Sequence, residues 1–493
     1  MPQPHRAPPD VSLTLRERLL LPVLVGCIVF PAWNVGGISQ WSEWVNLGLG
    51  TAGLLLLILP LPGGKKERHW HLNPMRNLGR LLRFPIFWLG LGFLFYVMLS
   101  LSNHWAVFHS DGLRWWLVSV ESTGWLPSSV KAPYGAHNGL RTLVQWSGPF
   151  LIVCVFWVAL VRRRMTSWLL ALAVGNAAVF AVLAFVQQAN HPQWILGFLP
   201  VGPNLNPFGT FVNANAAGMF LYLHLAVALG LTLALARDVS RGWRSLVGLV
   251  LTIAAAAIIT AGLVGTVSRA ALLFGGLLLV GFALSALWRL RQAGPSERLR
   301  LGLLLGGATL AGAAAVTFFF SRDTSQLETE AASLVSALKD PGGEARFEVI
   351  KVSASMATER PVLGWGPNGF RYAFPEYQRN ADSLWIDGET SRARSFFDYA
   401  HTDWLQIPIE FGLVGILPLL LMLSWWGWQV LRFRFNAGPI EAGLLLAALL
   451  ALGHASFDFV FYNPPVLVLF GLWLCLAVRR LQLNERRSRR PAR

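Results

Sequence analysis

Long apolar segments alternate with short polar ones along most of the chain. A helix needs roughly 20 apolar residues to cross the hydrocarbon core of a bilayer. Such segments lie at about 19–38, 42–62, 84–101, 142–161, 168–187, 214–236, 245–266, 270–288, 301–320, 404–430, 441–458 and 465–478. The pattern predicts an all-α fold, a polytopic integral membrane protein with about 12 transmembrane helices and a large helical extracytoplasmic loop.

The basic residues predict the orientation of these helices, because cytoplasmic loops of membrane proteins are enriched in Lys and Arg. With a cytoplasmic N-terminus, the inside segments hold 28 of the 41 Lys and Arg residues. Arg269 is the one basic residue in the short outside loops, and the other twelve lie in the long loops 102–141 and 321–403. We therefore expect both termini in the cytoplasm and both long loops outside. The first segment has no small-residue cleavage site, so we expect it to be retained.

Composition excludes two classes of protein. Of the 493 residues, 54% are hydrophobic and 13% charged, whereas soluble domains carry about 25% charged residues. A soluble enzyme and a disordered chain are both excluded. The net charge of +16 is explained by the topology signals, and we expect no nucleic-acid partner, although binding by the basic tail is an alternative. Cys27, Cys154 and Cys475 lie in apolar runs, so they predict neither disulfides nor a metal site.

We divide the chain into three regions. Residues 1–250 form N-terminal transmembrane helices with the outer loop 102–141, and residues 251–425 form a central domain with the loop 321–403. Residues 426–493 form C-terminal transmembrane helices and a basic cytoplasmic tail. Such a long polar loop inside a compact protein is usually functional.

The run 245–288 has 44 residues and a single charge, Arg269. This is too long for one span and fits two spans joined by a tight turn. An arginine at the bilayer centre costs roughly 2.5–3.5 kcal/mol on insertion scales, so we expect Arg269 in a turn near the outer interface. The alternative is an arginine that only marks the interface.

The long loop contains two predicted helices. Residues 327–338 have apolar side chains at helical spacing, and a second helix starts at Glu344 and stops before Pro361. Arg346 falls in its first turn, where free backbone N–H groups favour an anion and a guanidinium suits phosphate oxygens. A solvated charge paired with Glu344 or Glu348 is the alternative.

The segment 364–369, Gly-Trp-Gly-Pro-Asn-Gly, matches the G-x-G-x-x-G pattern of dinucleotide-binding proteins. That fingerprint needs a preceding strand and a following helix. Here a helical segment precedes and an aromatic stretch, 370–374, follows, so we reject a dinucleotide site. We expect a tight turn that seats Trp365 on the membrane or on a sugar face.

His401 lies at the outer boundary of the span 404–430. Histidine accepts a proton near neutral pH, and Asp403 or Asp398 could orient it; a bland interfacial histidine is the alternative. Glu410 and Asp458 are acidic residues within predicted spans, which makes them functional candidates.

Three stretches together resemble the O-antigen ligase/polymerase superfamily of bacterial membrane glycosyltransferases. The first is 210–218, Thr-Phe-Val-Asn-Ala-Asn-Ala-Ala-Gly, and the second is 266–271, Thr-Val-Ser-Arg-Ala-Ala. The third runs from Arg346 through 361–366, Pro-Val-Leu-Gly-Trp-Gly, to His401 and 412–415, Gly-Leu-Val-Gly. Thr402 stands where many members have Asn.

The resemblance implies transfer of a glycan from an undecaprenyl-pyrophosphate carrier to an acceptor hydroxyl on the outer face of the bacterial inner membrane. It further implies that Arg269 and Arg346 bind the pyrophosphate and that His401 activates or orients the acceptor. We add Asn213, Asn215, Trp365 and Asp403 as substrate-binding candidates. The implied reaction inverts the anomeric centre and needs no metal or other cofactor. The expected partners are the lipid-linked glycan, a glycan or lipid A core acceptor, and membrane lipids.

The sequence leaves several functions open. A ligase and a polymerase share the donor chemistry, so the acceptor is undetermined. A small-solute transporter, of the kind proposed for inorganic carbon, is the alternative function, and a structural scaffold for envelope assembly is a third. Transporters commonly show internal repeats and charges at the membrane midplane, whereas the candidate residues here gather at the outer edge.

Overall fold

The computed structural model describes residues 15–37, 39–61, 73–160, 163–197, 199–201, 207–239, 246–292, 294, 345–381, 384 and 397–488. Within these residues the chain is mostly helical, as expected. Eleven of the predicted spans fall on helices: α1 (Leu15–Trp33), α2 (Gln40–Ile58), α4 (Pro85–Ser100), α5 (Gly139–Ala159), α6 (Arg163–Asn190), α7 (Ala214–Val239), α8 (Leu246–Gly265), α9 (Arg269–Gln292), α15 (Asp403–Phe433), α16 (Pro439–His454) and α17 (Pro464–Ser488).

The number of membrane spans is smaller when judged by helix length and hydropathy alone. Eight described helices are long and apolar enough, or nine if α3 (Pro74–Leu82) and α4, bent by 67°, form one span. Helix α16 has 16 residues, and α1 begins with the charged residues Arg16, Glu17 and Arg18. The predicted span 301–320 and the predicted helix 327–338 lie outside the described residues, so the total of twelve stays a prediction.

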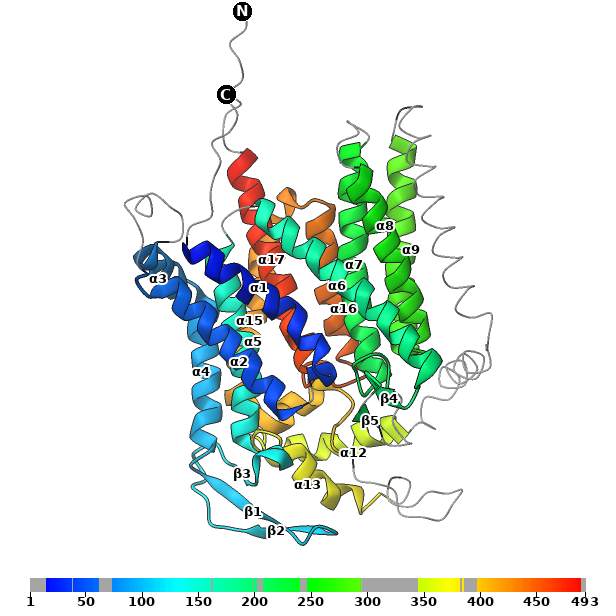
Figure 1. Ribbon diagram of the computed structural model, residues 1–493. Coiled ribbons are helices and arrows are strands. Elements are labelled where there is room, and N and C mark those ends of the chain that lie inside the picture. Colours follow the sequence, from blue (N-terminus) through cyan, green and yellow to red (C-terminus); the bar gives the residue numbers. More distant parts are fainter. Residues whose placement is uncertain are drawn as a thin grey trace, which may run out of the picture.

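The helices form a bundle with two distinct ends (Figure 1). Helix α1 begins and α17 ends at one end, which we call the terminal end. The opposite end carries the strands β1–β3 and the helices α12 (Ala345–Glu359) and α13 (Gly369–Gln378), and we call it the loop end. The described parts of the two long loops therefore lie at the same end of the bundle, as the distribution of basic residues predicts.

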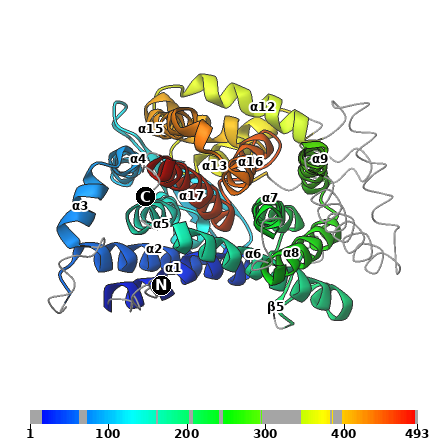
Figure 2. The same cartoon turned by 90° about the horizontal axis from the view of Figure 1, so that it is seen from above.

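Helices α7 and α17 lie in the interior of the bundle, as the view along its axis shows (Figure 2). Small residues allow α7 to approach α16 closely, which is how helices pack within membranes. A Cβ atom on Gly230 would lie 2.7 Å from the Pro439 carbonyl oxygen, and one on Gly443 would lie 2.5 Å from that of Ala226. These contacts hold the N-terminal half of the chain against its C-terminal end.

The segment 102–141 contains β-strands, which the expected all-α fold class did not include. It contains a three-stranded sheet of order β2-β1-β3, with β1 (His104–Ser110) antiparallel to β2 (Trp115–Ser119) and parallel to β3 (Ser129–Lys131). Two further strands, β4 (Trp194–Ile195) and β5 (Leu199–Pro200), form a small hairpin before α7. The sheet contacts the segment between α12 and α13, because Trp105 Nε1 donates to the Trp365 carbonyl oxygen at 3.0 Å.

Helix α15 is broken near its start. Gly412 has φ +58° and ψ −175°, which separates 403–411 from 413–433. The segment 361–366 fills the break: Trp365 N donates to the Ile409 oxygen and Leu413 N to the Pro361 oxygen. The Tyr96 hydroxyl of α4 lies 2.6 Å from the Leu363 oxygen and 2.9 Å from the Phe411 oxygen. Backbone groups freed by the break are thus paired, as buried polar groups must be.

Candidate functional site

The turn between α16 and α17 is fastened to the start of α15. Asp403 N donates to the Ala455 carbonyl oxygen at 2.8 Å, and Thr402 Oγ1 donates to the same oxygen at 3.2 Å. Phe461 N donates to Asp403 Oδ2 at 2.8 Å. These bonds fix residues 455–463 beside His401, which immediately precedes α15.

His401 lies against a carboxylate from this turn. Its backbone has φ +54°, and its Nδ1 is 3.8 Å from Asp458 Oδ1, with exposed side-chain fractions of 20% and 4%. The distance is an ion-pair contact when the imidazole is protonated, and it exceeds a hydrogen bond. The expected orienting groups were different: Asp398 is paired with Arg371 at 3.3 Å, and Asp403 is paired with the 455–463 turn. Asp458 is therefore the carboxylate that faces His401.

Asp458 lies outside the helix in which the sequence placed it. Helix α16 ends at His454, so Asp458 belongs to the turn at the loop end. Its Oδ1 accepts from Phe459 N at 2.9 Å, and its Oδ2 accepts from Asn215 Nδ2 at 3.3 Å. Two of the predicted site residues, His401 and Asn215, thus meet on one buried carboxylate.

Asn213 shapes the start of α7. Its Oδ1 accepts from the Asn215 backbone N–H at 2.8 Å, and its carbonyl oxygen accepts from Ala217 N at 3.2 Å. These bonds satisfy N–H groups that the first turn of a helix leaves unpaired. Asn213 therefore holds Asn215 in the position from which it reaches Asp458.

Arg269 begins α9 directly after a tight turn, as predicted. Val267 in this turn has φ +52°, and Ser268 Oγ accepts from Ala271 N at 3.4 Å. The turn packs on α7 one helical turn after Asn215, because a Cβ atom on Gly218 would lie 2.4 Å from Ala271 Cβ. The half-buried Arg269 is thus held near the helix start that carries Asn215.

Arg346 lies in the first turn of α12, as expected, and its side chain is outside the described part of the structure. In both views α12 begins on the side of the molecule where α9 lies (Figures 1 and 2). The backbone arrangement therefore brings the starts of α9 and α12 to the same side of the loop end. A meeting of the two guanidinium groups stays a prediction.

The glycine-rich segment 364–369 joins elements to one another. Gly366 has φ +88°, and a Cβ atom on it would lie 1.9 Å from the Ser128 oxygen. The Trp365 side chain is buried, and its Nε1 donates to the Met356 oxygen at 3.0 Å. This corrects the expectation of a tryptophan seated on a membrane or sugar surface. A helix, α13, does follow this segment, but the preceding element is α12 and no strand, so the dinucleotide pattern still lacks its context.

The Glu410 carboxylate accepts hydrogen bonds from several segments of the chain and so connects them. Tyr462 Oη donates to its Oε2 at 2.8 Å, Asn368 N donates to the same oxygen at 3.1 Å, and Gln406 Nε2 donates to Oε1 at 3.2 Å. Burial first, and then the neighbouring Glu410 carboxylate, raise the pKa of Tyr462, so that its hydroxyl remains a donor. Glu410 thus connects the helix break, the glycine-rich segment and the 455–463 turn.

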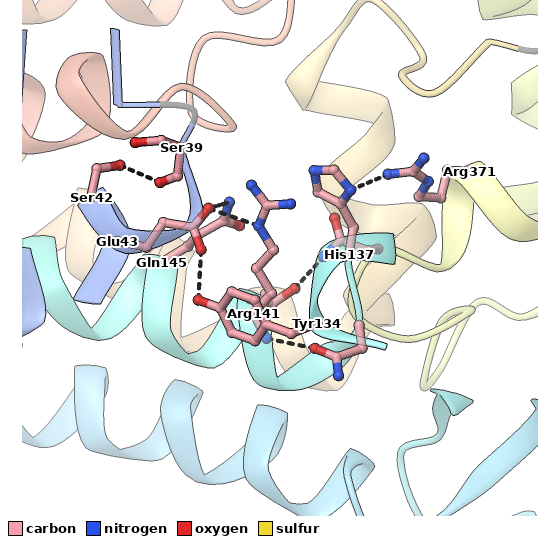
Figure 3. Close-up of polar contacts among 11 residues, drawn as sticks. Ser39, Ser42, Glu43, Tyr134, His137, Arg141, Gln145 and Arg371 are labelled. Carbon is pink, nitrogen blue, oxygen red and sulfur yellow. Dashed lines mark hydrogen bonds and ion pairs between the residues drawn. The ribbon is translucent and has the colours of Figure 1, made fainter. Parts of the chain in front are cut away.

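Sequence reasoning missed a second polar cluster, which is drawn in Figure 3. Glu43, in the first turn of α2, is 1% exposed; its Oε1 accepts from Arg141 Nε and Gln145 Nε2, both at 2.8 Å. Its Oε2 accepts from the Tyr134 hydroxyl at 2.7 Å. Glu43 lies in the predicted span 42–62, so the rule that marked Glu410 and Asp458 would also have marked it. The same holds for Glu441 of α16, whose Oε1 is 2.7 Å from Arg480 Nε.

The Glu43 cluster continues toward α13 through His137. The Arg371 guanidinium donates to His137 Nδ1 and also pairs with Asp398. Burial first, and then the charges of Arg141 and Arg371, lower the pKa of His137 to about 3. His137 is therefore a neutral acceptor that fastens α13 to the start of α5.

The helix bundle and the polar site at its loop end define a polytopic membrane protein with a surface site. Residues 254–420, about a third of the chain, match the family model described as O-Antigen ligase. This match confirms the resemblance to the O-antigen ligase/polymerase superfamily, and it supports an O-antigen ligase-like membrane glycosyltransferase at the family level. No curated protein matches the chain. The matched segment contains Arg269, Arg346 and His401 but neither Asn215 nor Asp458.

Proposed function

We propose that the protein transfers a glycan from an undecaprenyl-pyrophosphate carrier to an acceptor hydroxyl at the periplasmic face of the bacterial inner membrane. The observation that supports this most directly is the contact of His401 and Asn215 with Asp458, three residues from distant parts of the chain. It lies at the end of the bundle where Arg269 begins its helix. The loop end faces the periplasm, and both termini face the cytoplasm.

In this mechanism His401 is the general base. Its Nδ1 faces Asp458, so Nε2 is the nitrogen that takes the proton of the acceptor hydroxyl. The acceptor oxygen attacks the anomeric carbon, the bond from that carbon to the phosphate oxygen breaks, and its electron pair stays on the pyrophosphate. Asp458 stabilises the imidazolium that forms. Positioned base catalysis of this kind contributes about 10²–10⁴-fold.

Arg269 and Arg346 bind the pyrophosphate and stabilise the negative charge that develops as the bond to the sugar breaks. Planar guanidinium groups bind phosphate oxygens through two parallel hydrogen bonds, and preorganised donors are most effective where water is excluded. The donor arrives already activated by its pyrophosphate, so no metal ion and no nucleotide enters the proposed reaction.

Substitution of Arg269 tests the anion site in proteoliposomes supplied with a defined lipid-pyrophosphate glycan. We expect Arg269→Ala and Arg346→Ala each to abolish transfer, and Lys at either position to restore part of it, because an ammonium lacks the bidentate fork. Arg432→Ala, an exposed position in the last turn of α15 at the terminal end, is the matched control and should transfer normally. Full activity in both alanine variants of the site would remove the proposed role of the arginines.

A deletion strain distinguishes the two acceptor classes. Loss of the entire polysaccharide ladder on a gel, with the lipid-linked polymer retained, identifies a ligase. A surface lipid capped with a single repeat unit identifies a polymerase.

A further inference from the structure

A cavity of about 200 Å³ lies between α4, α5, α15 and α17. Its lining is apolar at nearly every position, with aromatic residues such as Phe93, Phe150 and Trp426 and aliphatic residues such as Leu423 and Leu467. Among the described residues of this lining, Asp403 is the one that can ionise. The cavity is thus shaped for hydrocarbon along its walls and carries a single polar group.

The cavity is long in the direction in which α15 runs. It reaches from Asp403 and Phe461 at the loop end to Trp426. On the part of α15 after its break alone, the lining extends from Ile416 to Trp426, which is about 15 Å at ~1.5 Å per residue. A slot with these proportions accommodates an extended chain and not a compact head group.

Asp403 has an unused acceptor inside this slot. The residue is 1% exposed, and Phe461 N donates to its Oδ2. The Val460 backbone N–H also acts on this carboxylate, but Oδ1 is buried and has no partner at hydrogen-bond geometry among the described residues. Buried polar atoms are almost always hydrogen-bonded, so an orphan oxygen in a cavity wall indicates a ligand that carries an N–H or O–H donor.

We propose that this cavity binds the hydrocarbon chain of a lipid acceptor, and that Asp403 Oδ1 accepts a hydrogen bond from an amide or hydroxyl group where the chain joins the head. The inference rests on the proposed function, because it assigns the acceptor of that reaction. Asp403 and His401 both contact the 455–463 turn, so a lipid held here presents its head beside the proposed base.

Charge argues against the carrier as the occupant. A polyprenyl chain is joined directly to a diphosphate, which would place its charges beside the Asp403 carboxyl group. Two more acidic residues, Asp458 and Glu410, lie close enough to Asp403 to disfavour a further negative charge there. The described residues of the cavity lining include no Lys or Arg. A neutral linkage with a hydrogen-bond donor matches this environment, and a diphosphate does not.

Photo-crosslinking of the full-length protein in phosphatidylcholine nanodiscs tests the occupant directly. The probe is an N-acylated glucosamine lipid with a diazirine near the end of its acyl chain. We expect labelled peptides from α4 and α15, competed by the unmodified N-acyl lipid and not by undecaprenyl diphosphate. Competition by the diphosphate instead, or labelling confined to other helices, would overturn the inference.

Tryptophan substitutions inside and outside the cavity test whether the probe is bound there. Leu423→Trp and Leu467→Trp place bulk in the lining and should reduce labelling at least about tenfold. Leu421→Trp is the control, since Leu421 is on the same helix, is 46% exposed and does not line the cavity. Equal labelling in filled and control variants would overturn the inference.

The unpaired Asp403 Oδ1 predicts that the cavity prefers a lipid with an amide linkage over one with an ester linkage. The unaltered protein should label several-fold more strongly with an amide-linked probe than with the corresponding ester, because the ester has no donor for Oδ1 and a hydrogen bond contributes about 1 kcal/mol. Asp403→Asn should remove the preference, since Asn retains one oxygen for Phe461 N. An unchanged preference in Asp403→Asn would contradict the role of Oδ1.

Transfer assays separate this inference from the proposed function. With acylated and deacylated acceptors of the same sugar sequence, Leu423→Trp should raise the KM for the acylated acceptor at least about tenfold and leave the deacylated one unchanged. An equal rise in the KM of the polyprenyl donor would assign the cavity to the carrier. That result would overturn the inference about the cavity and leave the proposed function standing. Absence of transfer to either acceptor by the unaltered protein would overturn the proposed function itself.

Discussion

At the scale of single residues, the sequence identifies the histidine but not its partner. Asp398 and Asp403 are the carboxylates nearest to His401 in the chain, yet Asp458, 57 residues further on, is the one that faces it. Nearness in sequence is a weak guide here, because α15 and α16 run away from the loop end and back before Asp458 is reached. Asn215, by contrast, was identified through a local motif, and it does reach the site.

A double-mutant cycle tests whether His401 and Asp458 act as a unit. We expect His401→Ala to lower kcat about 10²–10⁴-fold, the contribution of a positioned base. Asp458→Asn should lower it too, and the double variant should be little slower than His401→Ala alone, because groups that act together have non-additive effects. The readout is single-turnover transfer in proteoliposomes.

Asp238→Asn, an exposed carboxylate of α7 at the terminal end, is the control for loss of charge and should be fully active. Strictly multiplicative losses in the double variant would show that Asp458 does not act through His401.

The buried His137 predicts a pH dependence of stability. Its pKa is lowered to about 3, first by burial, while an unfolded histidine titrates near 6.5. Between these values the unfolded state binds a proton that the folded state does not, so stability falls as pH decreases from about 6.5 toward 3 and is fully present above 6.5. The difference in unfolding temperature between the unaltered protein and His137→Asn in detergent should shrink over this range.

Asn retains an acceptor for Arg371 but does not titrate. The variant therefore keeps the hydrogen bond to Arg371 and removes only the titration. A difference that stays constant from pH 7 to pH 4 would exclude His137 as the titrating group.

At the scale of elements, helix prediction succeeds where apolar periodicity is long. Helix α12 lies within the predicted 344–360, and the described spans fall on helices. The sheet in 102–141 was missed, although its signal was present: β1 and β2 are short aromatic and β-branched runs separated by the four residues 111–114, Asp-Gly-Leu-Arg, and a loop of this length with a glycine is typical of a hairpin. The break at Gly412 could not be predicted, because it depends on 361–366 filling the gap.

Gly366 should be intolerant of any side chain. Its φ of +88° disfavours other residues, and a Cβ atom would lie 1.9 Å from the Ser128 oxygen, so the backbone must move. We expect Gly366→Ala to destabilise the protein by at least about 1–3 kcal/mol, the cost of comparable backbone strain. Thermal unfolding followed by tryptophan fluorescence measures this.

Gly427→Ala in α15 has nothing within 4 Å of the new Cβ atom and should be neutral or slightly stabilising. Equal unfolding temperatures for the two variants would show that the contact between 364–369 and β3 does not stabilise the loop end.

At the scale of the whole molecule, the two ends of the bundle should lie on opposite sides of the membrane. Leu113, in the β1–β2 hairpin of the loop end, is 96% exposed, and Phe435, after α15 at the terminal end, is 86% exposed. We expect Leu113→Cys to react with a membrane-impermeant maleimide in intact spheroplasts, and Phe435→Cys to react after lysis alone.

The three native cysteines are buried, so the unaltered protein provides the background. Labelling of Phe435→Cys in intact spheroplasts would invert the orientation and place the proposed site in the cytoplasm.

The division of the site between the family segment and the rest of the chain has a consequence for chimeric proteins. A graft of residues 254–420 into a homologous scaffold would carry His401, Arg269 and Arg346. The recipient would have to supply the carboxylate equivalent to Asp458 and the amide equivalent to Asn215. Such a hybrid can be assembled with its reactive groups intact and still be inactive. Its repair would need substitutions in the recipient at the positions equivalent to Asn215 and Asp458.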